Sequence, residues 1–324
     1  MKNHSAEVAL LACLADGKCH STETLEALLS TTQSTVGKHI KYLQGWGIDI
    51  FFIRGGGYRL SQPVNLLSKQ YLAKKLPNPI CLYSVIDSTN QYLWERKKTL
   101  PSGMVCLTEH QKRGRGRHGK QWYASFGASL CFSIYWNLTL GTSGALGLSL
   151  ILGIATIDAL ESVGISGVQL KWPNDIYYGG KKLAGILVEI SGRPKTPADL
   201  VIGIGINLFN QRYMLTHIDQ PWISLSEIPG GIKVNRNRLA EHIIRCWNQT
   251  LSGYKATGRT GLGSSTIARW YELDGFINCP VKLLVGEKEI CGINRGINQY
   301  GAILIKTNSR IESFNSGEIL LRRN

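Results

Sequence analysis

The sequence predicts an α+β protein of several domains, because three parts of the chain show three different patterns of helices and strands. Three short helical segments and a hairpin fill residues 1–62, apolar strand-like runs alternate with helices over residues 80–270, and short strands with glycine turns fill residues 271–324. Residues 63–79 begin and end with prolines and are predicted to be a linker. We therefore predict an N-terminal winged helix-turn-helix, a central α/β domain and a small C-terminal barrel of SH3-like size.

The composition is that of a globular protein with a polyanionic partner. Of the 324 residues, 43% are hydrophobic and 18% are charged, and 37 Lys+Arg against 22 Asp+Glu give a net charge of +15. The eight cysteines are scattered and several lie within apolar runs, so we expect buried, reduced thiols in a cytoplasmic protein. No signal peptide is evident, and no run approaches the roughly 18 apolar residues of a membrane helix, so no membrane partner is expected.

The N-terminal segment has the element order of a winged helix-turn-helix. Val36, Ile40 and Leu43 fall on one face of the third helical segment at i, i+4 and i+7. Two strand-like runs follow, joined by a glycine turn at residues 54–57. We expect the third helix to enter the major groove and the wing to touch the DNA backbone, through Gln33, Ser34, Thr35, Lys38, His39, Lys41 and Arg54. The alternative is a three-helix module that binds another protein.

A glycine-rich cationic segment is the centre of the predicted site. Between Thr108 and Trp136, five cations alternate with glycines before an apolar strand: Lys112, Arg113, Arg115, Arg117 and Lys120, with Gly114, Gly116 and Gly119. Glycine lets the backbone approach a ligand, and arginine supplies a fixed fork of donors to phosphate or carboxylate. The glycine spacing matches the dinucleotide fingerprint, but a polar run precedes it and a strand follows, which disfavours a Rossmann site. A solvated basic loop without a ligand is the other alternative.

Further motifs bring polar groups and glycines to the ends of predicted strands. They are Asp87-Ser88-Thr89-Asn90, Lys171-Trp172-Pro173-Asn174-Asp175, the run from Lys182 to Glu189, and Gly203-x-Gly205-x-Asn207. The sequence shows no Ser/His/Asp set, no metal-ligand cluster and no P-loop. The predicted site is therefore cationic and has no evident nucleophile, which suits a reaction whose substrates supply the reacting groups. Attack of a carboxylate on the α-phosphate of ATP, with Mg²⁺ bridging the phosphates, fits that description.

In this order the motifs resemble the biotin protein ligase family, and with the N-terminal module they resemble its bifunctional form, the biotin operon repressor. The resemblance covers essentially the whole chain. It implies a catalytic domain related to class II synthetases, with a mixed sheet, that makes biotinyl-5′-AMP from biotin and ATP. It also implies transfer of biotin to a lysine of the biotin carboxyl carrier protein of acetyl-CoA carboxylase. In the repressor form the adenylate is the corepressor. It promotes a homodimer, through an edge strand near residues 189–193, that binds the operator of biotin biosynthesis genes.

The resemblance also implies roles for individual residues. Lys182 and Arg117 are expected to be catalytic, and no protein-bound metal is expected beside the Mg²⁺ that accompanies ATP. The expected biotin site consists of Ser88, Thr89, Asn90, Gln111, Arg115, Gly116, Arg117, Lys182, Gly185, Gly203 and Gly205. The expected ATP and adenylate site consists of Arg117, Lys171, Asn174, Lys182, Asn207 and Trp222. His118 departs from the family, which often has arginine there, so it bears on the order of the loop.

Two other functions compete with this interpretation. A DNA-binding biotin sensor without ligase activity would not need Lys182 or the complete basic loop. A lipoate-type ligase shares the fold, but the KWPND and GRGR segments disfavour it.

Overall fold

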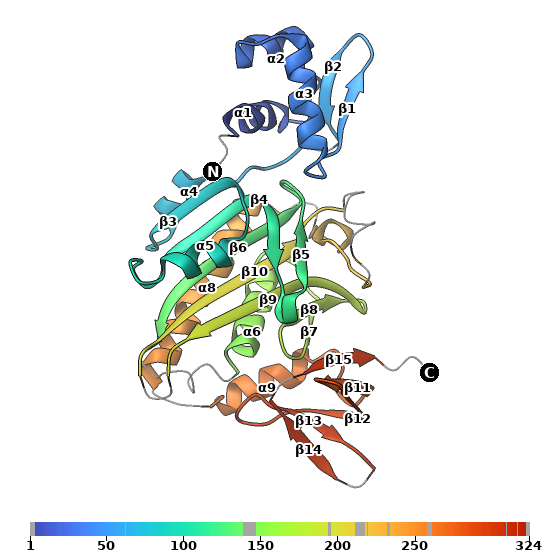
Figure 1. The fold of residues 1–324 in the computed structure, drawn as a ribbon. Coiled ribbons are helices and arrows are strands. Elements are labelled where there is room, and N and C mark those ends of the chain that lie inside the picture. Colours follow the sequence, from blue (N-terminus) through green and yellow to red (C-terminus); the bar gives the residue numbers. More distant parts are fainter. Residues whose placement is uncertain are drawn as a thin grey trace.

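The computed structural model describes residues 4–61, 63–138, 147–193, 196–210, 218, 220–231, 234–257, 261–308, 310–315 and 317–321. Figure 1 shows a helical module at the N-terminal end, a large sheet in the middle and a smaller group of strands at the C-terminal end. The predicted domain limit at residue 62 lies outside the described residues. No helix of the described ranges is long and apolar enough to cross a membrane.

The N-terminal module consists of three helices and a hairpin, in the predicted order. These are α1 (Ser5–Leu14), α2 (Thr22–Leu29), α3 (Gln33–Gln44), β1 (Ile50–Ile53) and β2 (Gly57–Leu60). Helix α2 begins where the Ser21 hydroxyl accepts a hydrogen bond from the Thr24 amide at 3.2 Å, which is an ordinary N-cap. Val36, Ile40 and Leu43 are buried against α1 and α2, so the predicted apolar face of α3 is confirmed.

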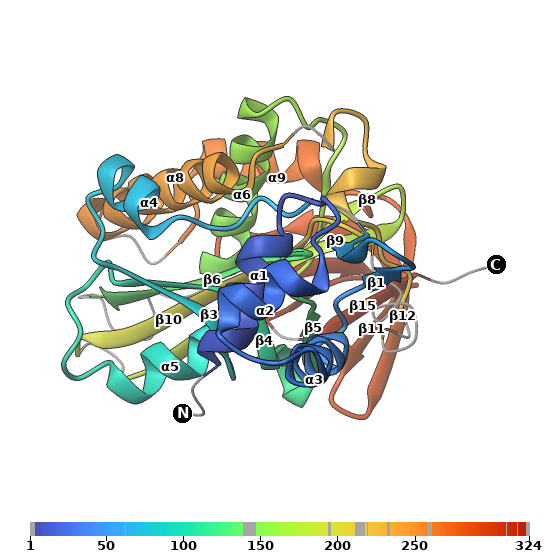
Figure 2. The same cartoon turned by 90° about the horizontal axis from the view of Figure 1, so that it is seen from above.

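The central domain is built on an eight-stranded mixed sheet in the order β3-β4-β6-β10-β9-β8-β7, with β5 paired to β4. Its strands are β3 (Ile80–Ile86), β4 (Val105–Arg115), β5 (Gln121–Ala124), β6 (Ser129–Leu138), β7 (Gln169–Lys171), β8 (Asp175–Tyr178), β9 (Lys181–Ser191) and β10 (Ala198–Asn207). Only β3 and β4 run parallel among the pairs of this sheet. Figure 2 shows α6 (Leu148–Ser162) and α8 (Arg236–Thr257) on one face, and α5 (Thr89–Arg96) on the other.

The C-terminal strands form a five-stranded antiparallel sheet that shares the core of the central domain. The strands are β11 (Pro280–Val285), β12 (Lys288–Ile297), β13 (Ile303–Lys306), β14 (Ile311–Phe314) and β15 (Glu318–Leu321), in the order β14-β13-β12-β11-β15. The domain limit expected at 270/271 lies inside helix α9 (Ser264–Leu273). Trp270 of this helix is buried in the shared core. A hydrogen bond of 3.0 Å from the Trp172 indole to the Gly301 carbonyl ties the two sheets together.

Two details differ from the sequence-based expectation, namely the polar run before Gly114 and the burial of the cysteines. The polar run before Gly114 is the end of strand β4, because its residues pair with β3 and β5, so a strand does precede the glycine motif. A 3-10 turn at Arg117–Gly119 and then β5 follow it, so the helix that a dinucleotide fingerprint needs is replaced by a turn and a strand. Only Cys106 and Cys131 of the eight free cysteines are buried. The linker has a short helical pattern around residues 66–76 in its sequence, and the structure agrees, because it contains the helix α4 (Lys69–Lys75).

Candidate functional site

One cavity lies between the start of α5, the β4–β5 hairpin and the glycine-bearing strands β9 and β10. Its empty volume is about 970 Å³, including its open mouth. All eleven residues expected to hold biotin line it: Ser88, Thr89, Asn90, Gln111, Arg115, Gly116, Arg117, Lys182, Gly185, Gly203 and Gly205. The fold therefore brings together five sequence motifs that are as far as 117 residues apart along the chain (from Ser88 to Gly205).

The start of α5 forms a buried polar wall of the cavity. Ser88 caps the helix, since its hydroxyl accepts a hydrogen bond from the Gln91 amide at 3.4 Å. The Gln111 side-chain oxygen accepts bonds from the Thr89 amide at 2.9 Å and the Thr89 hydroxyl at 3.2 Å. The Ser133 hydroxyl donates to the Thr89 hydroxyl at 2.7 Å. These side chains are held in place by one another, which prepares a rigid polar surface for a ligand.

Two glycines of β10 are required by the side chains that pack on them. A Cβ atom at Gly203 would overlap the Asn90 amide, and one at Gly205 would overlap the Trp122 indole. The Trp122 ring lies on the bare Gly205 backbone and lines the cavity. Its Nε1 is buried and has no hydrogen-bond partner among the described residues. The sequence analysis missed this tryptophan, although it follows the basic segment by only two residues.

Four of the five lysines and arginines that line the cavity are each held by a side chain of opposite charge or by an amide. Lys182 Nζ lies 2.9 Å from Asp175 Oδ1, Arg115 Nη2 lies 2.7 Å from Glu189 Oε1, and Lys120 Nζ lies 2.7 Å from Glu318 Oε2. Arg117 donates a hydrogen bond of 3.3 Å to Asn174 Oδ1. Sequence reasoning gave none of the three carboxylates a role. Asp175 and Glu189 stand inside motifs that were noticed, whereas Glu318 comes from the other domain and had no signal in the sequence.

Lys171 and Asn174 lie at the expected nucleotide end of the cavity. Lys171 Nζ donates a hydrogen bond of 3.1 Å to the Tyr177 hydroxyl, and burial lowers the pKa of Lys171. Burial also lowers the pKa of Arg117, although Asp175 and Glu318 oppose this shift. Both changes come from the cost of keeping a cation away from water. An anion bound here would offset that cost.

The structure places Asn207 and Trp222 behind Lys182 rather than in the cavity lining. Trp222 forms an isolated β-bridge with Lys182. The Asn207 amide donates long hydrogen bonds to the carbonyls of Ile223, at 3.4 Å, and Lys182, at 3.5 Å. Its Oδ1 is buried without a partner among the described residues. In this arrangement the two residues support the backbone that carries the Lys182 side chain.

On the N-terminal module, most of the expected DNA-binding side chains are accessible. Gln33, Ser34, Lys38, Lys41 and Arg54 are exposed, and Thr35 is half-buried. His39 differs, because its Nδ1 lies 3.1 Å from Oε1 of the buried Glu7 in α1. This contact ties the His39 ring to the body of the module.

Two family models match the chain. Residues 82–207 match the family described as "Biotin/lipoate A/B protein ligase family", and residues 276–322 match the "Biotin protein ligase C terminal domain". Together with the cavity, these matches define the class of protein as a ligase that attaches a cofactor to other proteins.

Comparison with individual proteins narrows this class. The chain is 42% identical over 323 residues to the bifunctional ligase/repressor BirA of Escherichia coli strain K12, which covers 99% of both chains. It is 27% identical over 308 residues to the bifunctional ligase/repressor BirA of Bacillus subtilis, covering 93% of both. The biotin protein ligase of Aquifex aeolicus, solved with biotin and ATP, superposes with a TM-score of 0.64 at 29% identity, covering 77% of this chain and all of that one. The chain therefore belongs to the biotin protein ligase family, with full-length similarity to its bifunctional ligase/repressor members. The prediction of a ligase made from the motifs is confirmed at this level.

Proposed function

We propose that the protein joins biotin to ATP, giving biotinyl-5′-AMP and pyrophosphate. It then transfers the biotinyl group to a lysine of the biotin carboxyl carrier protein, which releases AMP. In the first step a biotin carboxylate oxygen forms a bond to the α-phosphorus, and the bond to the pyrophosphate oxygen breaks. In the second step the lysine amine attacks the acyl carbon, AMP leaves, and the amine loses a proton. The protein's groups align the two anions and neutralise their charge.

The observation that carries this proposal is the set of three cation–carboxylate pairs around the cavity. Lys182, Arg115 and Lys120 are paired with Asp175, Glu189 and Glu318 at 2.7–2.9 Å. An anionic ligand would exchange one partner of each pair for a phosphate or carboxylate oxygen, so the cations would keep a counter-charge throughout the reaction. Lys182 would contact the biotin carboxylate and the α-phosphate, and Arg117 would close over the adenylate. Ser88, Thr89, Asn90 and Gln111 would hold the biotin head group.

We further propose that Mg²⁺ enters with ATP. Asp175 and Glu318 line the cavity and are the protein groups that fit such an ion, because Mg²⁺ commonly takes one or two carboxylates and keeps phosphate and water as its other ligands. When bound, the ion would neutralise charge on the phosphates. Within the described ranges, no group of three or more His, Cys, Asp or Glu side chains is placed to hold a metal.

The N-terminal module is proposed to be a winged helix-turn-helix that binds the operator of biotin biosynthesis genes as a homodimer. Exposed polar side chains along α3 and the exposed Arg54 in the hairpin turn support it. The dimer is proposed to form through β9, because β8 pairs only with residues 181–185 of that strand. No other strand of the described part of the chain pairs with the same edge of residues 187–191. Biotinyl-5′-AMP would act as the corepressor.

The test supplies the purified protein with ATP, Mg²⁺, biotin and an apo carrier domain, and measures the carrier mass. We expect a gain of one biotinyl group that needs both ATP and biotin, and no gain on a carrier whose target lysine is replaced by arginine. The same assay with lipoate in place of biotin distinguishes a lipoate-type ligase from a biotin ligase, because only a lipoate-type ligase would add a lipoyl group to the carrier. Biotin binding without carrier labelling would contradict the ligase proposal and favour a sensor. Operator binding measured with and without biotinyl-5′-AMP tests the repressor.

A further inference from the structure

A buried ion pair lies between the sheet and α8, outside the cavity. Arg236 is 1% exposed and Glu109 is 6% exposed, and Arg236 Nη1 lies 2.7 Å from Glu109 Oε2. Burying two charges is costly even when they pair well. Arg236 is also the first residue of α8, where the helix dipole disfavours a cation. Neither burial nor a place at the start of a helix favours an arginine at this position. The contacts of Arg236 must therefore account for it.

Arg236 bridges two neighbouring strands at the point where they separate. The pairing of β4 with β6 ends at Thr108 and Cys131. Beyond that point Arg236 contacts both strands. Its Nη1 pairs with the Glu109 carboxylate of β4, and its Nη2 donates a hydrogen bond of 3.1 Å to the Ser129 carbonyl of β6. The arginine therefore replaces the missing ladder and fixes the distance between the two strand ends.

The end of β4 leads directly into the proposed biotin site. Gln111 follows Glu109 by two residues, and its side chain accepts both hydrogen bonds from Thr89 at the head of α5. A shift of Glu109 would move this contact, because a strand transmits displacement along its own backbone. The pair thus acts on the cavity without touching a ligand.

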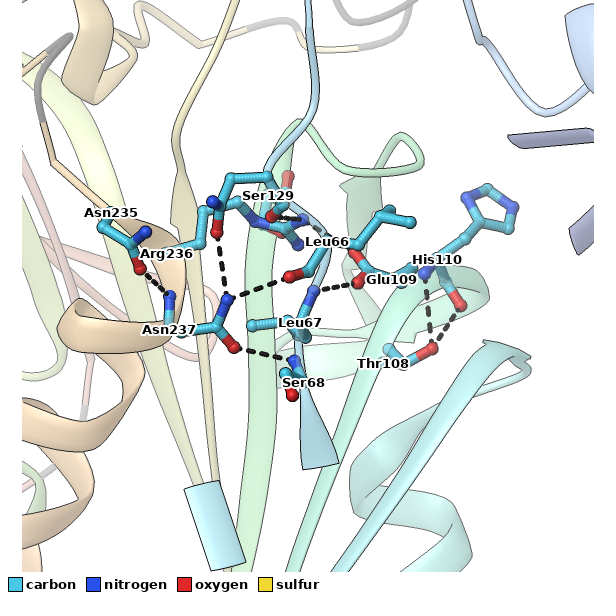
Figure 3. Close-up of polar contacts among 11 residues, drawn as sticks. Leu66, Leu67, Ser68, Thr108, Glu109, His110, Ser129, Asn235, Arg236 and Asn237 are labelled. Carbon is cyan, nitrogen blue, oxygen red and sulfur yellow. Dashed lines mark hydrogen bonds and ion pairs between the residues drawn. The ribbon is translucent and has the colours of Figure 1, made fainter. Parts of the chain in front are cut away.

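The interdomain linker is fastened to the same pair, as Figure 3 shows. Glu109 Oε1 accepts a hydrogen bond from the Leu67 amide at 2.5 Å, and Arg236 Nη1 donates one to the Asn65 carbonyl at 2.9 Å. Asn237 adds bonds to the Leu66 carbonyl at 2.9 Å and from the Ser68 amide at 2.7 Å. Residues 65–68 are therefore held by the side chains that define the position of β4.

We propose that Arg236 and Glu109 are positioning residues for the biotin site, and that the linker held by Asn237 is the third member of this device. The proposal rests on the proposed function, because it takes the cavity to bind biotin. It predicts that biotin affinity depends on two α8 side chains and a linker that do not contact biotin. The adenylation step itself would depend on them much less, since the cations of the cavity are left in place.

The experiment measures biotin dissociation constants by calorimetry and the rate of pyrophosphate release at saturating biotin, on the full chain. For Arg236→Met we expect biotin affinity to fall by about tenfold to hundredfold, as for a small misplacement of a binding group, with kcat within about twofold of the parent. Arg236→Lys should recover part of the affinity, because the charge returns without the fork. Arg269→Met is the matched control: Arg269 is half-exposed, and pairs with Asp158, Glu161 and Glu272 away from the cavity.

Asn237→Ala separates the linker from the ion pair, because among its hydrogen bonds the side chain of Asn237 contacts only linker residues. We expect its affinity for biotin to fall about threefold to tenfold with kcat unchanged. It also keeps the test decisive if Arg236→Met does not fold. Parent-like affinity in Asn237→Ala would overturn the linker's part. Parent-like affinity in Arg236→Met, or a fall in kcat alone, would overturn the positioning proposal. A parent that binds no biotin would overturn the proposed function as well.

Discussion

Lys182 is the residue on which the proposed chemistry depends most directly. Its ammonium lies 2.9 Å from Asp175 and its main chain is fixed on both sides by Pro221 and Ile223. Lys182→Ala should slow adenylate formation by about 10²–10³-fold, because one preorganised charge at the reacting phosphate is lost. Biotin-dependent pyrophosphate release measures this rate. The control is Lys181→Ala, an exposed lysine on the same strand, and an unchanged rate in Lys182→Ala would remove its assigned role.

Gly205 tests how closely the cavity wall is packed. An added methyl group would overlap the Trp122 indole, so Gly205→Ala should push the ring from its place. Overpacking of this kind costs about 1–3 kcal/mol. If the cost falls on the bound state, biotin affinity should fall by roughly 5- to 150-fold.

The control for this substitution is Gly253→Ala in α8, where a Cβ atom meets nothing within 4 Å. It should leave biotin binding unchanged and should not destabilise the fold, since alanine favours a helix. Calorimetric titration of both variants with biotin makes the comparison. Equal affinities would show that Trp122 is free to move and that the cavity wall is not rigid.

At the scale of the element, β9 serves two purposes along its length. Its first half carries Lys182 and pairs with β8, and one edge of its second half has no partner strand among the residues that the structure describes. Ile190 lies in that second half and is 37% exposed. Ile190→Lys should weaken the adenylate-dependent homodimer at least about tenfold, because burying an isoleucine contributes roughly 1.5–3 kcal/mol and a charge opposes edge pairing.

Sedimentation with biotinyl-5′-AMP measures this dimer. Ile311→Lys is the matched control, since Ile311 is 57% exposed on β14 of the C-terminal sheet. Carrier labelling by either variant should equal that of the parent. A dimer of unchanged affinity in Ile190→Lys would mean that another surface joins the copies.

The sequence predicted elements and motifs more readily than it predicted what holds them together. The apolar spacing of Val36, Ile40 and Leu43 sufficed to place the buried face of α3, because helical periodicity is a local property. The glycines at 203 and 205 indicated a close approach, but the groups that approach them, Asn90 and Trp122, could not be named. Such pairings depend on strand order, which local pattern does not encode.

The same limit explains the partners of the cavity cations. Arg115 and Lys120 were expected to face a ligand, and their partners Glu189 and Glu318 lie 74 and 198 residues further along the chain. The end of β4 was expected to be a polar loop, because its side chains alternate too little to show a strand. Its partners β3 and β5 are what make it one. Long-range pairing therefore decides the details of the site that composition leaves open.

At the scale of the whole molecule, the net charge of +15 predicts how operator binding responds to salt. Lys41 is exposed near the end of α3. If it contacts one phosphate, Lys41→Ala removes two contacts from a dimer, and the slope of log K against log salt should fall by about 1.8, since each contact contributes about 0.9. Lys288→Ala, an exposed lysine on β12, should leave the slope unchanged. Fluorescence anisotropy over a salt series tests this, and equal slopes would exclude Lys41 from the interface.

The contact between the N-terminal module and the central sheet should be sensitive to acid. The His110 ring of β4 stacks on Trp46 of the module, with ring centres 5.5 Å apart, and its Nδ1 donates a hydrogen bond of 2.8 Å to the Ala124 carbonyl. Burial lowers the pKa of His110 from 6.5 to about 4, and the charge of Lys112 adds to the shift. The neutral ring is therefore favoured in the folded state.

The contribution of the neutral His110 ring to the free energy of unfolding is therefore complete above pH 6.5. It is lost as the pH falls towards 4, because His110 takes up its proton at a higher pH in the unfolded chain than in the folded protein. Between pH 7.5 and pH 5 the loss should be about 2 kcal/mol in the free energy of unfolding. His110→Phe keeps an aromatic ring against Trp46 but has no proton to gain. Its unfolding free energy should start lower at pH 7.5, because the Ala124 carbonyl loses its donor, and should then fall less steeply than that of the parent. Urea titrations of both proteins at pH 7.5 and pH 5 test this prediction. If the difference between the two unfolding free energies shrinks at pH 5, the acid sensitivity of the docked module comes from His110. If the difference is the same at both pH values, the acid sensitivity comes from another group.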